Sequence, residues 1–275
     1  PYLLTVNTAY GELIKMIKQE FFKILKSPKS LLTYILICAI SIGDSVYAIL
    51  NSGESGMFGN SHPAMVSLFS AQTTVITRIA FFWVMPVYLM LFYADKYAVE
   101  KSCKMTNVYF VKTERRKYFL GKTGCAFFSV FTMFAIPFLI NFAINCIFLH
   151  GNTSFFDMEN WQASERSGLL NISLAHPYLT YLCYILSALV IYGMLCIMCQ
   201  SIAMIFGDNR VAYVLSFAIW MMFYSSRGLT INHALQPFCE GVELSSAIGA
   251  FSLFGVTVFA FTAAAYIKTV IKNEI

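Results

Sequence analysis

Gly121, Lys122 and Thr123 form the tripeptide that ends a phosphate-binding loop, so the first question is whether this chain binds ATP. The loop has the pattern G-x-x-x-x-G-K-[ST], in which backbone N–H groups surround the phosphates and the lysine reaches them. Its first glycine would fall at position 116, where the chain has Arg116. A long apolar run also follows Thr123, where a soluble helix is needed. We therefore expect no nucleotide site in this chain.

The other residues that could bind metals or react are also weakly patterned. Cys196 and Cys199 have the spacing of a redox or zinc pair, but they lie in an apolar stretch without a second pair, which favours packing. Cys239 is the one cysteine predicted outside, so we expect no disulfide between outer loops. The histidines show no helical pairing that would hold a metal; they are His62, His150, His176 and His233. Because no catalytic motif is present, we expect neither enzymatic activity nor a cofactor.

The composition predicts that these residues are positioned by membrane-spanning helices. The chain has 275 residues, of which 58% are hydrophobic and 12% charged, whereas soluble domains have about 25% charged residues. A span needs about 20 mostly apolar residues. Six stretches qualify: Leu31–Leu50, a stretch ending with Ile79–Ala94 that begins near Ala64, Cys125–Leu149, Tyr178–Phe206, Val211–Tyr224 (starting at Asn209 or Arg210) and Ala247–Ile267. We expect an all-α integral membrane protein with six transmembrane helices, in which Pro86 and Pro137 bend the second and third spans.

The distribution of basic residues predicts the orientation. With both termini in the cytoplasm, sixteen lysines and arginines lie inside and three lie outside, namely Arg78, Arg166 and Arg227. We therefore place residues 1–30 as a cytoplasmic N-terminal segment, followed by a six-span domain over residues 31–275. The expected location is a cell membrane.

Residues 11–27 are predicted to form an amphipathic helix. Apolar side chains recur at helical spacing on one face, and lysines cover much of the other. Pro28 then ends the helix before the first span. A lysine-rich helix beside a span favours the membrane surface and anionic lipid, and packing on a partner protein is the alternative.

The loop of residues 94–122 is the largest predicted cytoplasmic element. It has eight basic and three acidic residues, together with many aromatic and aliphatic ones. Positive-inside anchoring and attraction to anionic lipid both explain the charge, but neither explains the apolar side chains. Docking on another protein explains both.

A few polar residues lie inside the predicted spans. Asp44 is the one carboxylate well inside a span, whereas ion-coupled carriers usually keep several ionisable groups. Asn141 and Asn145 are four residues apart on the third span, and Gln200 lies in the fourth. These four side chains are candidates for helix packing or for the wall of a translocation path. Residues 225–246 are too short to cross and too apolar for a free loop, so we expect a re-entrant or interfacial hairpin before the last span.

The order of these elements resembles the permease subunit of an ABC-2-type transporter. In that family a surface "elbow" helix, matching residues 11–27, precedes six spans, and the loop between spans two and three contacts a separate ATPase subunit. The resemblance rests on this architecture and on the run TERRKYFLGK (residues 113–122) after two acids. It implies a coupling role for Asp95, Glu100, Arg115, Arg116, Tyr118 and Lys122. It also implies that ATP and Mg²⁺ bind the ATPase, and that the permease works with a second copy or a related permease.

The cargo is less constrained. The short outer loops resemble those of small Gram-positive permeases that export lantibiotics or phenol-soluble modulins, so the resemblance implies an amphipathic peptide or lipid-like substrate. Drugs, lipids and glycans are the alternatives within the family. Outside it, an ion-coupled carrier would depend on Asp44, and a membrane-anchored receptor would bind a partner through the basic loop without ATP-driven transport. Nothing in the sequence indicates a nucleic-acid partner.

Overall fold

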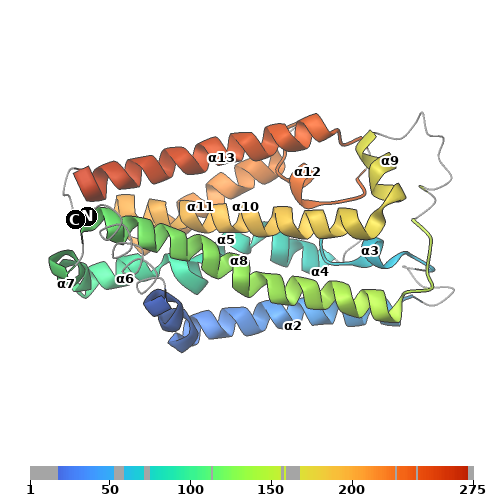
Figure 1. Ribbon diagram of the computed structural model, residues 1–275, viewed down its shortest axis with the longest axis horizontal. Coiled ribbons are helices and arrows are strands. Elements are labelled where there is room, and N and C mark those ends of the chain that lie inside the picture. The colour runs from blue at the N-terminus through green and yellow to red at the C-terminus, as the bar shows by residue number, and fades with distance from the viewer. Residues whose placement is uncertain are drawn as a thin grey trace, which may run out of the picture.

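The computed structural model describes residues 18–52, 59–70, 75–112, 114–155, 158, 168–226, 228–239 and 241–271. Within these residues the chain is an elongated bundle of helices. Its long members are α2 (Pro28–Leu50), α8 (Arg115–Phe148), α10 (Pro177–Phe206), α11 (Asn209–Ser225) and α13 (Leu244–Tyr266), the last continued by the π-helix η4 (Ile267–Ile271). They run along the long axis of the molecule, with α10 at the centre (Figure 1).

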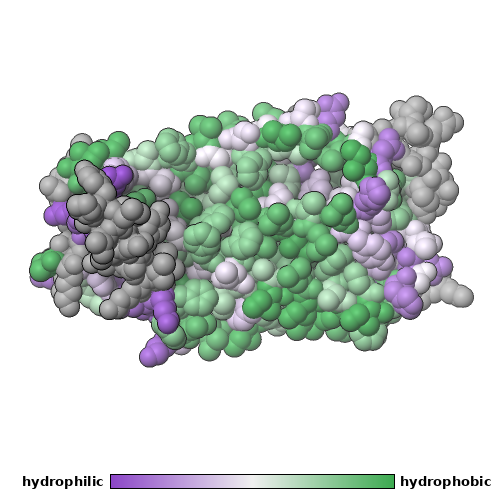
Figure 2. Space-filling view, in the orientation of Figure 1, coloured by the Kyte–Doolittle hydropathy of each residue, from purple (hydrophilic) through white to green (hydrophobic). Residues whose placement is uncertain are grey.

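Among the described residues, four helices are long and apolar enough to cross a membrane. They are α2, α8, α10, and α13 together with η4, and the bent segment from Val75 to Ala94 would be a fifth. On the face shown in Figure 2, apolar side chains form a broad band across the middle of the molecule, and hydrophilic ones gather toward its two ends. An all-helical membrane protein is thus supported by four or five of the six expected spans. Helix α11, with 17 residues, is shorter than the other candidate spans.

The second expected span is broken rather than continuous. Helix α3 covers only Pro63–Val66, and Ser67 after it has an extended backbone with ψ of 161°. The expectation that this span runs as one helix from Ala64 is therefore wrong. Beyond the undescribed residues 71–74, the chain continues as α4 (Val75–Arg78), η1 (Ile79–Trp83), α5 (Met85–Leu89) and η2 (Met90–Ala94).

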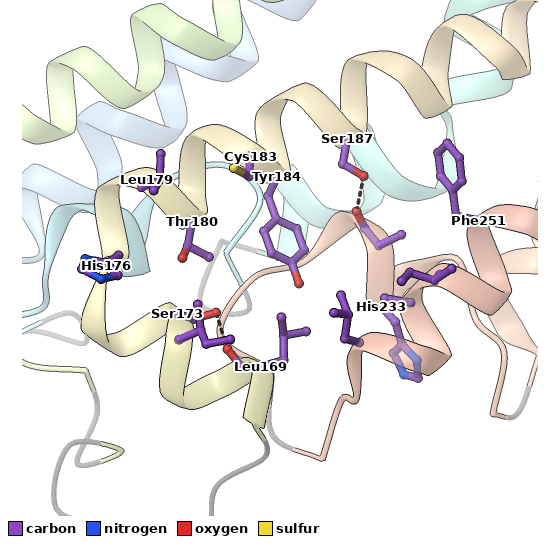
Figure 3. A pocket seen from close by; sticks show the side chains of 15 residues that line it. Leu169, Ser173, His176, Leu179, Thr180, Cys183, Tyr184, Ser187, His233 and Phe251 are labelled. Atoms are coloured by element: carbon purple, nitrogen blue, oxygen red, sulfur yellow. Dashed lines mark hydrogen bonds between the residues drawn. The ribbon is translucent and has the colours of Figure 1, made fainter.

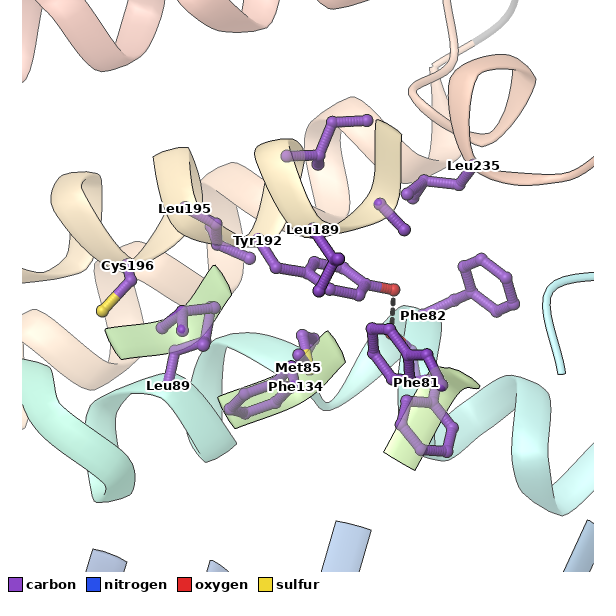
Figure 4. Packing of buried hydrophobic residues seen from close by; sticks show 14 of the residues in the cluster. Phe81, Phe82, Met85, Leu89, Phe134, Leu189, Tyr192, Leu195, Cys196 and Leu235 are labelled. Atoms are coloured by element: carbon purple, nitrogen blue, oxygen red, sulfur yellow. Dashed lines mark hydrogen bonds between the residues drawn. The ribbon is translucent and has the colours of Figure 1, made fainter. Parts of the chain in front are cut away.

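The segment from Val75 to Ala94 bends by 55° between Trp83 and Met85, as the position of Pro86 predicts. Proline has no N–H, so the carbonyl of Phe82 has no helical donor four residues later. The indole Nε1–H of Trp220 on α11 donates to that carbonyl. The hydroxyl of Tyr192 on α10 donates to the carbonyl of Phe81 at 2.7 Å (Figure 4). The bend is therefore stabilised by donors from two neighbouring helices, which is how irregular backbone is tolerated at membrane depth.

The helices pack around an aromatic core that α8 and α10 share with the bent segment. Phe69 meets Phe138 edge-on with ring centroids 4.8 Å apart, and Phe92 meets Phe134 in the same way at 5.5 Å. Gly193 on α10 lies directly against the ring of Phe127 on α8, where an added Cβ would come within 2.6 Å. The helices can approach this closely because position 193 has no side chain.

One end of the bundle has a helical lobe. Helices α6 (Lys96–Ser102) and α7 (Met105–Lys112) connect the bent segment to α8, and we call this pair the α6–α7 lobe. A helix over residues 18–26 lies at the same end, as does η4. The amphipathic helix expected over residues 11–27 is thus present from residue 18 to 26, and residues 11–17 lie outside the described part of the chain.

The opposite end has two short helices, α9 (Gly168–Ala175) and α12 (Asn232–Leu235). Helix α9 lies between the expected spans that end at Leu149 and begin at Tyr178, a region that the sequence leaves as an outer loop. It follows the polar stretch DMENWQASERS and consists mostly of apolar residues. Helix α12 lies within the expected hairpin, where Ile231, Leu235 and Phe238 are buried. Two hydrogen bonds tie the segment to the bundle. The N–H of Ile231 donates to the carbonyl of Phe223, and the hydroxyl of Ser187 donates to the carbonyl of Ala234.

Candidate functional site: a buried charge cluster, a polar helix junction and an apolar cavity

The α6–α7 lobe is joined to the rest of the molecule by a buried set of charges. We call it the Lys122 cluster, and it consists of Glu20, Lys23, Glu100, Tyr109, Tyr118 and Lys122. These residues come from the 18–26 helix, α6, α7 and the first turns of α8. The cluster therefore connects the 18–26 helix to the consecutive helices α6, α7 and α8, with Lys23 and Glu100 77 residues apart in sequence.

Lys122 is at the centre of the cluster. Its ammonium group lies 2.7 Å from the carboxylate of Glu20 and 2.8 Å from that of Glu100, and the residue is only 2% exposed. Lys23 contacts the same two carboxylates at 2.5 and 3.2 Å and donates to the Tyr109 hydroxyl at 2.7 Å. Tyr118 donates to Glu100 at 3.0 Å. Two carboxylates and two ammonium groups thus neutralise one another, with Lys122 buried and the Lys23 side chain 37% exposed at the edge of the cluster.

The pKa shifts at the edge of the cluster agree with this pairing. Burial alone would raise the pKa of Glu20, but Lys122 and Lys23 outweigh it and hold that pKa below the ordinary value. Burial would likewise lower the pKa of Lys23, but its bonds to Glu20 and Tyr109 raise it instead. Both groups are ionised at neutral pH. Loss of one member of a buried pair leaves the other charge uncompensated, which costs about 3–5 kcal/mol.

Most of the residues expected to contact an ATPase lie inside the protein. Asp95, Glu100, Tyr118 and Lys122 are each no more than 7% exposed, so their side chains do not form the outer surface of the lobe. Glu100, Tyr118 and Lys122 instead bond to one another inside the cluster. Arg115 is half-buried and Arg116 is exposed. Among the side chains of the lobe whose exposure the structure describes, Val99, Met105 and Val111 are large, apolar and exposed, the last at 88%. A partner would meet these residues together with Arg116.

The sequence analysis missed Glu20, Lys23 and Tyr109 as members of this site. Glu20 had a usable signal, because it lies three residues after Ile17 and four before Ile24, on the apolar face of the predicted helix. An acid on such a face requires a buried cation. The partner itself, Lys122, is 102 residues away, so sequence spacing could not identify it.

A second polar group, which we call the Asp44 junction, joins α2 to α4 and α8. Thr77 donates to one oxygen of Asp44 at 2.8 Å. The amide nitrogen of Asn141 lies 3.4 Å from the other oxygen and donates to the Ser41 carbonyl and the Ser45 hydroxyl, each at 2.8 Å. Asp44 is 5% exposed and Asn141 is fully buried. Asp44 and Asn141 therefore hold helices together.

Asn141 of the Asp44 junction, together with Tyr181 and Asn145, also forms hydrogen bonds at the break in the chain after α3. The side-chain oxygen of Asn141 accepts from the N–H of Leu68 at 3.1 Å, and the Tyr181 hydroxyl accepts from the N–H of Phe69 at 3.2 Å. Asn145 donates to the Ser67 hydroxyl at 3.1 Å. Two of the four candidate path residues thus support this break. Gln200 is separate: it is 2% exposed, and its amide has no hydrogen-bond partner among the described residues.

An apolar cavity of about 420 Å³ lies near the other end of the bundle, between α9, α10, α12 and α13. Tyr184 points into it, and Phe251 lines its far side (Figure 3). Two hydroxyls in its wall are already bonded within the protein, that of Ser173 to the carbonyl of Leu169 and that of Ser187 to the carbonyl of Ala234. The wall therefore presents mainly hydrocarbon, which suits an apolar ligand.

The histidines and cysteines that could bind a metal form no such site among the described residues. Among the described residues, no group of three or more His, Cys, Asp or Glu side chains could hold a metal ion. All eight cysteines are free thiols, and Cys196 and Cys199 are fully buried in α10. His62 accepts from the N–H of Ala64 at the start of α3 and stacks on Phe155 with ring centroids 4.8 Å apart, so it has a structural role.

The helices and polar junctions are compatible with a multi-pass helical membrane protein. The chain is similar to the uncharacterized protein YybM of Bacillus subtilis (strain 168), with 23% identity over 225 residues that cover 81% of this chain and 86% of that protein. No family model matches the chain. No solved structure matches it either.

Proposed function

We propose that this chain is the permease subunit of an ABC-2-type exporter in a bacterial cell membrane. The observation that supports this most is the Lys122 cluster, which fixes the α6–α7 lobe and the 18–26 helix to the start of α8. Helix α8 is continuous for 34 residues, or about 50 Å. A movement imposed on the lobe would therefore be transmitted along this helix into the membrane.

In this proposal the protein has six spans. Helix α11 is the sixth span, in addition to the five candidates. Its 17 residues extend about 25 Å and meet the lower length limit for a span. Six crossings place both ends of the chain on the side of the lobe, and the excess of basic residues makes that side cytoplasmic. The segment around α12 is then a re-entrant hairpin, because Ile231, Leu235 and Phe238 are buried and hydrogen bonds tie its backbone to α10 and α11.

The proposed partners follow from the same arrangement. A separate ATPase subunit binds ATP and Mg²⁺. It contacts the lobe and the first turn of α8 through Val111, Arg116 and neighbouring exposed side chains. A second copy of this chain, or a related permease, completes the transporter. The apolar cavity between α9 and α13 supports an amphipathic cargo, and we favour a toxin or antimicrobial peptide over drugs, lipids or glycans.

The test is co-purification with the ATPase encoded beside this chain. We expect the double variant Val111→Ser/Arg116→Ala to lose at least about tenfold in affinity, since both side chains are exposed, Val111 on the lobe and Arg116 in the first turn of α8, and a few contact residues provide most of an interface's binding energy. Arg210→Ala is the matched control, because Arg210 is also exposed but lies at the turn into α11. Equal recovery of the ATPase with wild type and the double variant would place the contact elsewhere, and no recovery with wild type would contradict the proposal.

An ion-coupled carrier remains the alternative from another class. It would place the coupling ion at Asp44, the carboxylate of the junction between α2, α4 and α8. Asp44→Asn separates the two proposals, because the amide can keep the hydrogen bond from Thr77 but cannot take up a cation's charge. If the wild-type chain transports a substrate in a system without any ATPase and Asp44→Asn abolishes that transport, the carrier is favoured.

A further inference from the structure

A second cavity lies between the start of α2 and the α6–α7 lobe. Its volume is about 380 Å³, and we call it the interfacial cleft. Its residues are Lys23, Ser27, Pro28, Lys29, Leu91, Asp95, Lys96, Val99, Glu100 and Met105. Leu91, Val99 and Met105 are apolar, and charged side chains lie beside them. The cleft thus combines a hydrocarbon wall with charge, at the point where the chain enters its first long apolar helix.

The charges around the cleft do not cancel. Three lysines and two carboxylates line it, and Glu20 and Lys122 behind the wall add one charge of each sign. Lys23 is neutralised by Glu20 and Glu100. Within the described part of the chain, neither Lys29 nor Lys96 has a carboxylate oxygen within 4.0 Å. One positive charge is therefore left over.

Lys29 and Lys96 occupy different depths. Lys29 is exposed. The ammonium group of Lys96 is buried 5.6 Å from the centre of the Tyr93 ring and has no hydrogen-bond acceptor among the described residues. A buried polar group without a partner is costly, and an anion in the cleft would offset the charge of Lys96. Asp95 opposes such an anion, because its carboxylate lies near both lysines.

We propose that the interfacial cleft binds the phosphate of an anionic phospholipid such as phosphatidylglycerol, with Lys29 contacting the phosphate and an acyl chain lying along Leu91 and Val99. A phosphodiester has the single negative charge that the cleft lacks. Basic pockets beside membrane helices bind such headgroups. Leu25 and Leu32, which lie two and three residues along the chain from the lining residues Ser27 and Lys29, are 44% and 69% exposed, so the surroundings suit acyl chains. The lipid would join α2 to the lobe.

Free phosphate has the same anionic chemistry, so the test must separate the two sources. The full chain in a neutral detergent is titrated with dioctanoyl-phosphatidylglycerol, dioctanoyl-phosphatidylcholine or inorganic phosphate, and bound ligand is counted by native mass spectrometry. We expect phosphatidylglycerol to bind at least about fivefold more tightly than phosphatidylcholine, because each lysine near a headgroup contributes roughly that much. Inorganic phosphate should not compete at equal concentration.

The variants give opposite expectations. Lys29→Gln and Lys96→Gln should each remove most of the preference for phosphatidylglycerol, and Asp95→Asn should increase it. Lys26→Gln is the control, because Lys26 is exposed on the preceding helix and does not line the cleft. Lys29 is exposed, so its variant should fold even if Lys96→Gln does not. Equal binding of both lipids to wild type, an unchanged preference in Lys29→Gln, or full competition by inorganic phosphate would each overturn the proposal. None of these results depends on an ATPase or on transport.

Discussion

Lys122 and Lys96 show how partners decide what a buried ammonium group costs. Lys122 has two carboxylates within 2.8 Å, so its charge is compensated where it lies. Lys96 feels the same charges of Glu20 and Lys122, but its ammonium group lies against an aromatic ring and has no hydrogen-bond acceptor in the described part of the chain. Burial therefore lowers the pKa of Lys96 to about 8, despite the attraction of Glu20. The first lysine stabilises the lobe, and the second destabilises it while charged.

This difference predicts a pH dependence of stability. An unfolded lysine keeps its proton up to its ordinary pKa of 10.5, whereas folded Lys96 loses it near pH 8. Between these values the unfolded chain binds more protons, so the free energy of unfolding should rise with pH. Lys23 does not interfere, because its raised pKa keeps its stabilisation intact until above pH 10.5. Lys96→Met should be more stable than wild type at pH 7.5, and its advantage should shrink by pH 9.5.

The measurement is thermal unfolding in detergent without added lipid, followed by a thiol-reactive dye that reports exposure of the buried Cys196 and Cys199. The difference between wild type and variant at each pH cancels the titration of other groups. Lys26→Met is the control for removal of an exposed lysine. A wild-type and a Lys96→Met curve that run parallel from pH 7.5 to 9.5 would show that Lys96 does not titrate in this range.

At the scale of elements, α8 and α10 form the pair on which the bundle is built. Gly193 allows α10 to pack onto Phe127 of α8, and a Cβ at that position would lie 2.6 Å from the ring. Gly193→Ala should therefore lower the free energy of unfolding by about 1–3 kcal/mol, because the ring has to move within a packed core. Gly43→Ala is the matched control on α2, where nothing lies within 4 Å of the new Cβ.

The control should be neutral or stabilising by up to about 1 kcal/mol, since alanine is the better helix former. Each variant adds one methyl group to a helix of the wild-type protein. A difference between their free energies of unfolding therefore reports packing and not helix propensity. Thermal unfolding with the same thiol dye gives both values. If Gly193→Ala proves as stable as Gly43→Ala, α8 and α10 are packed less closely than the structure shows.

The sequence predicted the long helices well and the irregular segments poorly. Long apolar runs determined α2, α10 and α13 to within three residues at their starts, because a run of that length has few alternatives. The break at Ser67 was missed, since its support comes from Asn141 and Tyr181, far away in the chain. Helix α8 begins ten residues before the expected span, because Tyr118 and Lys122 are buried by partners that hydropathy does not register.

The sequence grouped some residues of the Lys122 cluster, but not its members that lie far away in the chain. Glu100, Tyr118 and Lys122 belong to the six residues that the resemblance implied for coupling, and the structure brings these three together. Their expected position on a contact surface did not follow, because charge and aromatic content do not reveal which side faces inward. Arg116 and Val111 are two of the exposed residues of that segment, and whether they contact an ATPase stays a prediction.

For the whole molecule, the number of spans decides which side the lobe and the apolar cavity face. Helix α11 is the critical element, because its 17 residues extend about 25 Å, less than the roughly 30 Å of the hydrocarbon core, and only just meet the lower length limit for a span. With six spans, Arg210 and Ser226, both exposed at opposite ends of α11, lie on opposite sides of the membrane. Cys103, exposed between α6 and α7, lies on the side of Arg210.

Labelling of intact cells with a membrane-impermeant maleimide tests this arrangement, with modified peptides identified by mass spectrometry. We expect Ser226→Cys to be labelled from outside, and Arg210→Cys and the native Cys103 only after the cells are opened. If neither introduced cysteine reacts in intact cells, α11 does not cross the membrane and the last helix must end on the opposite side. If Cys103 reacts in intact cells, the lobe faces outward, where no ATPase could reach Arg116, and the proposed transporter is excluded. The expected pattern places the lobe where ATP is available and the apolar cavity toward the side to which cargo would be released.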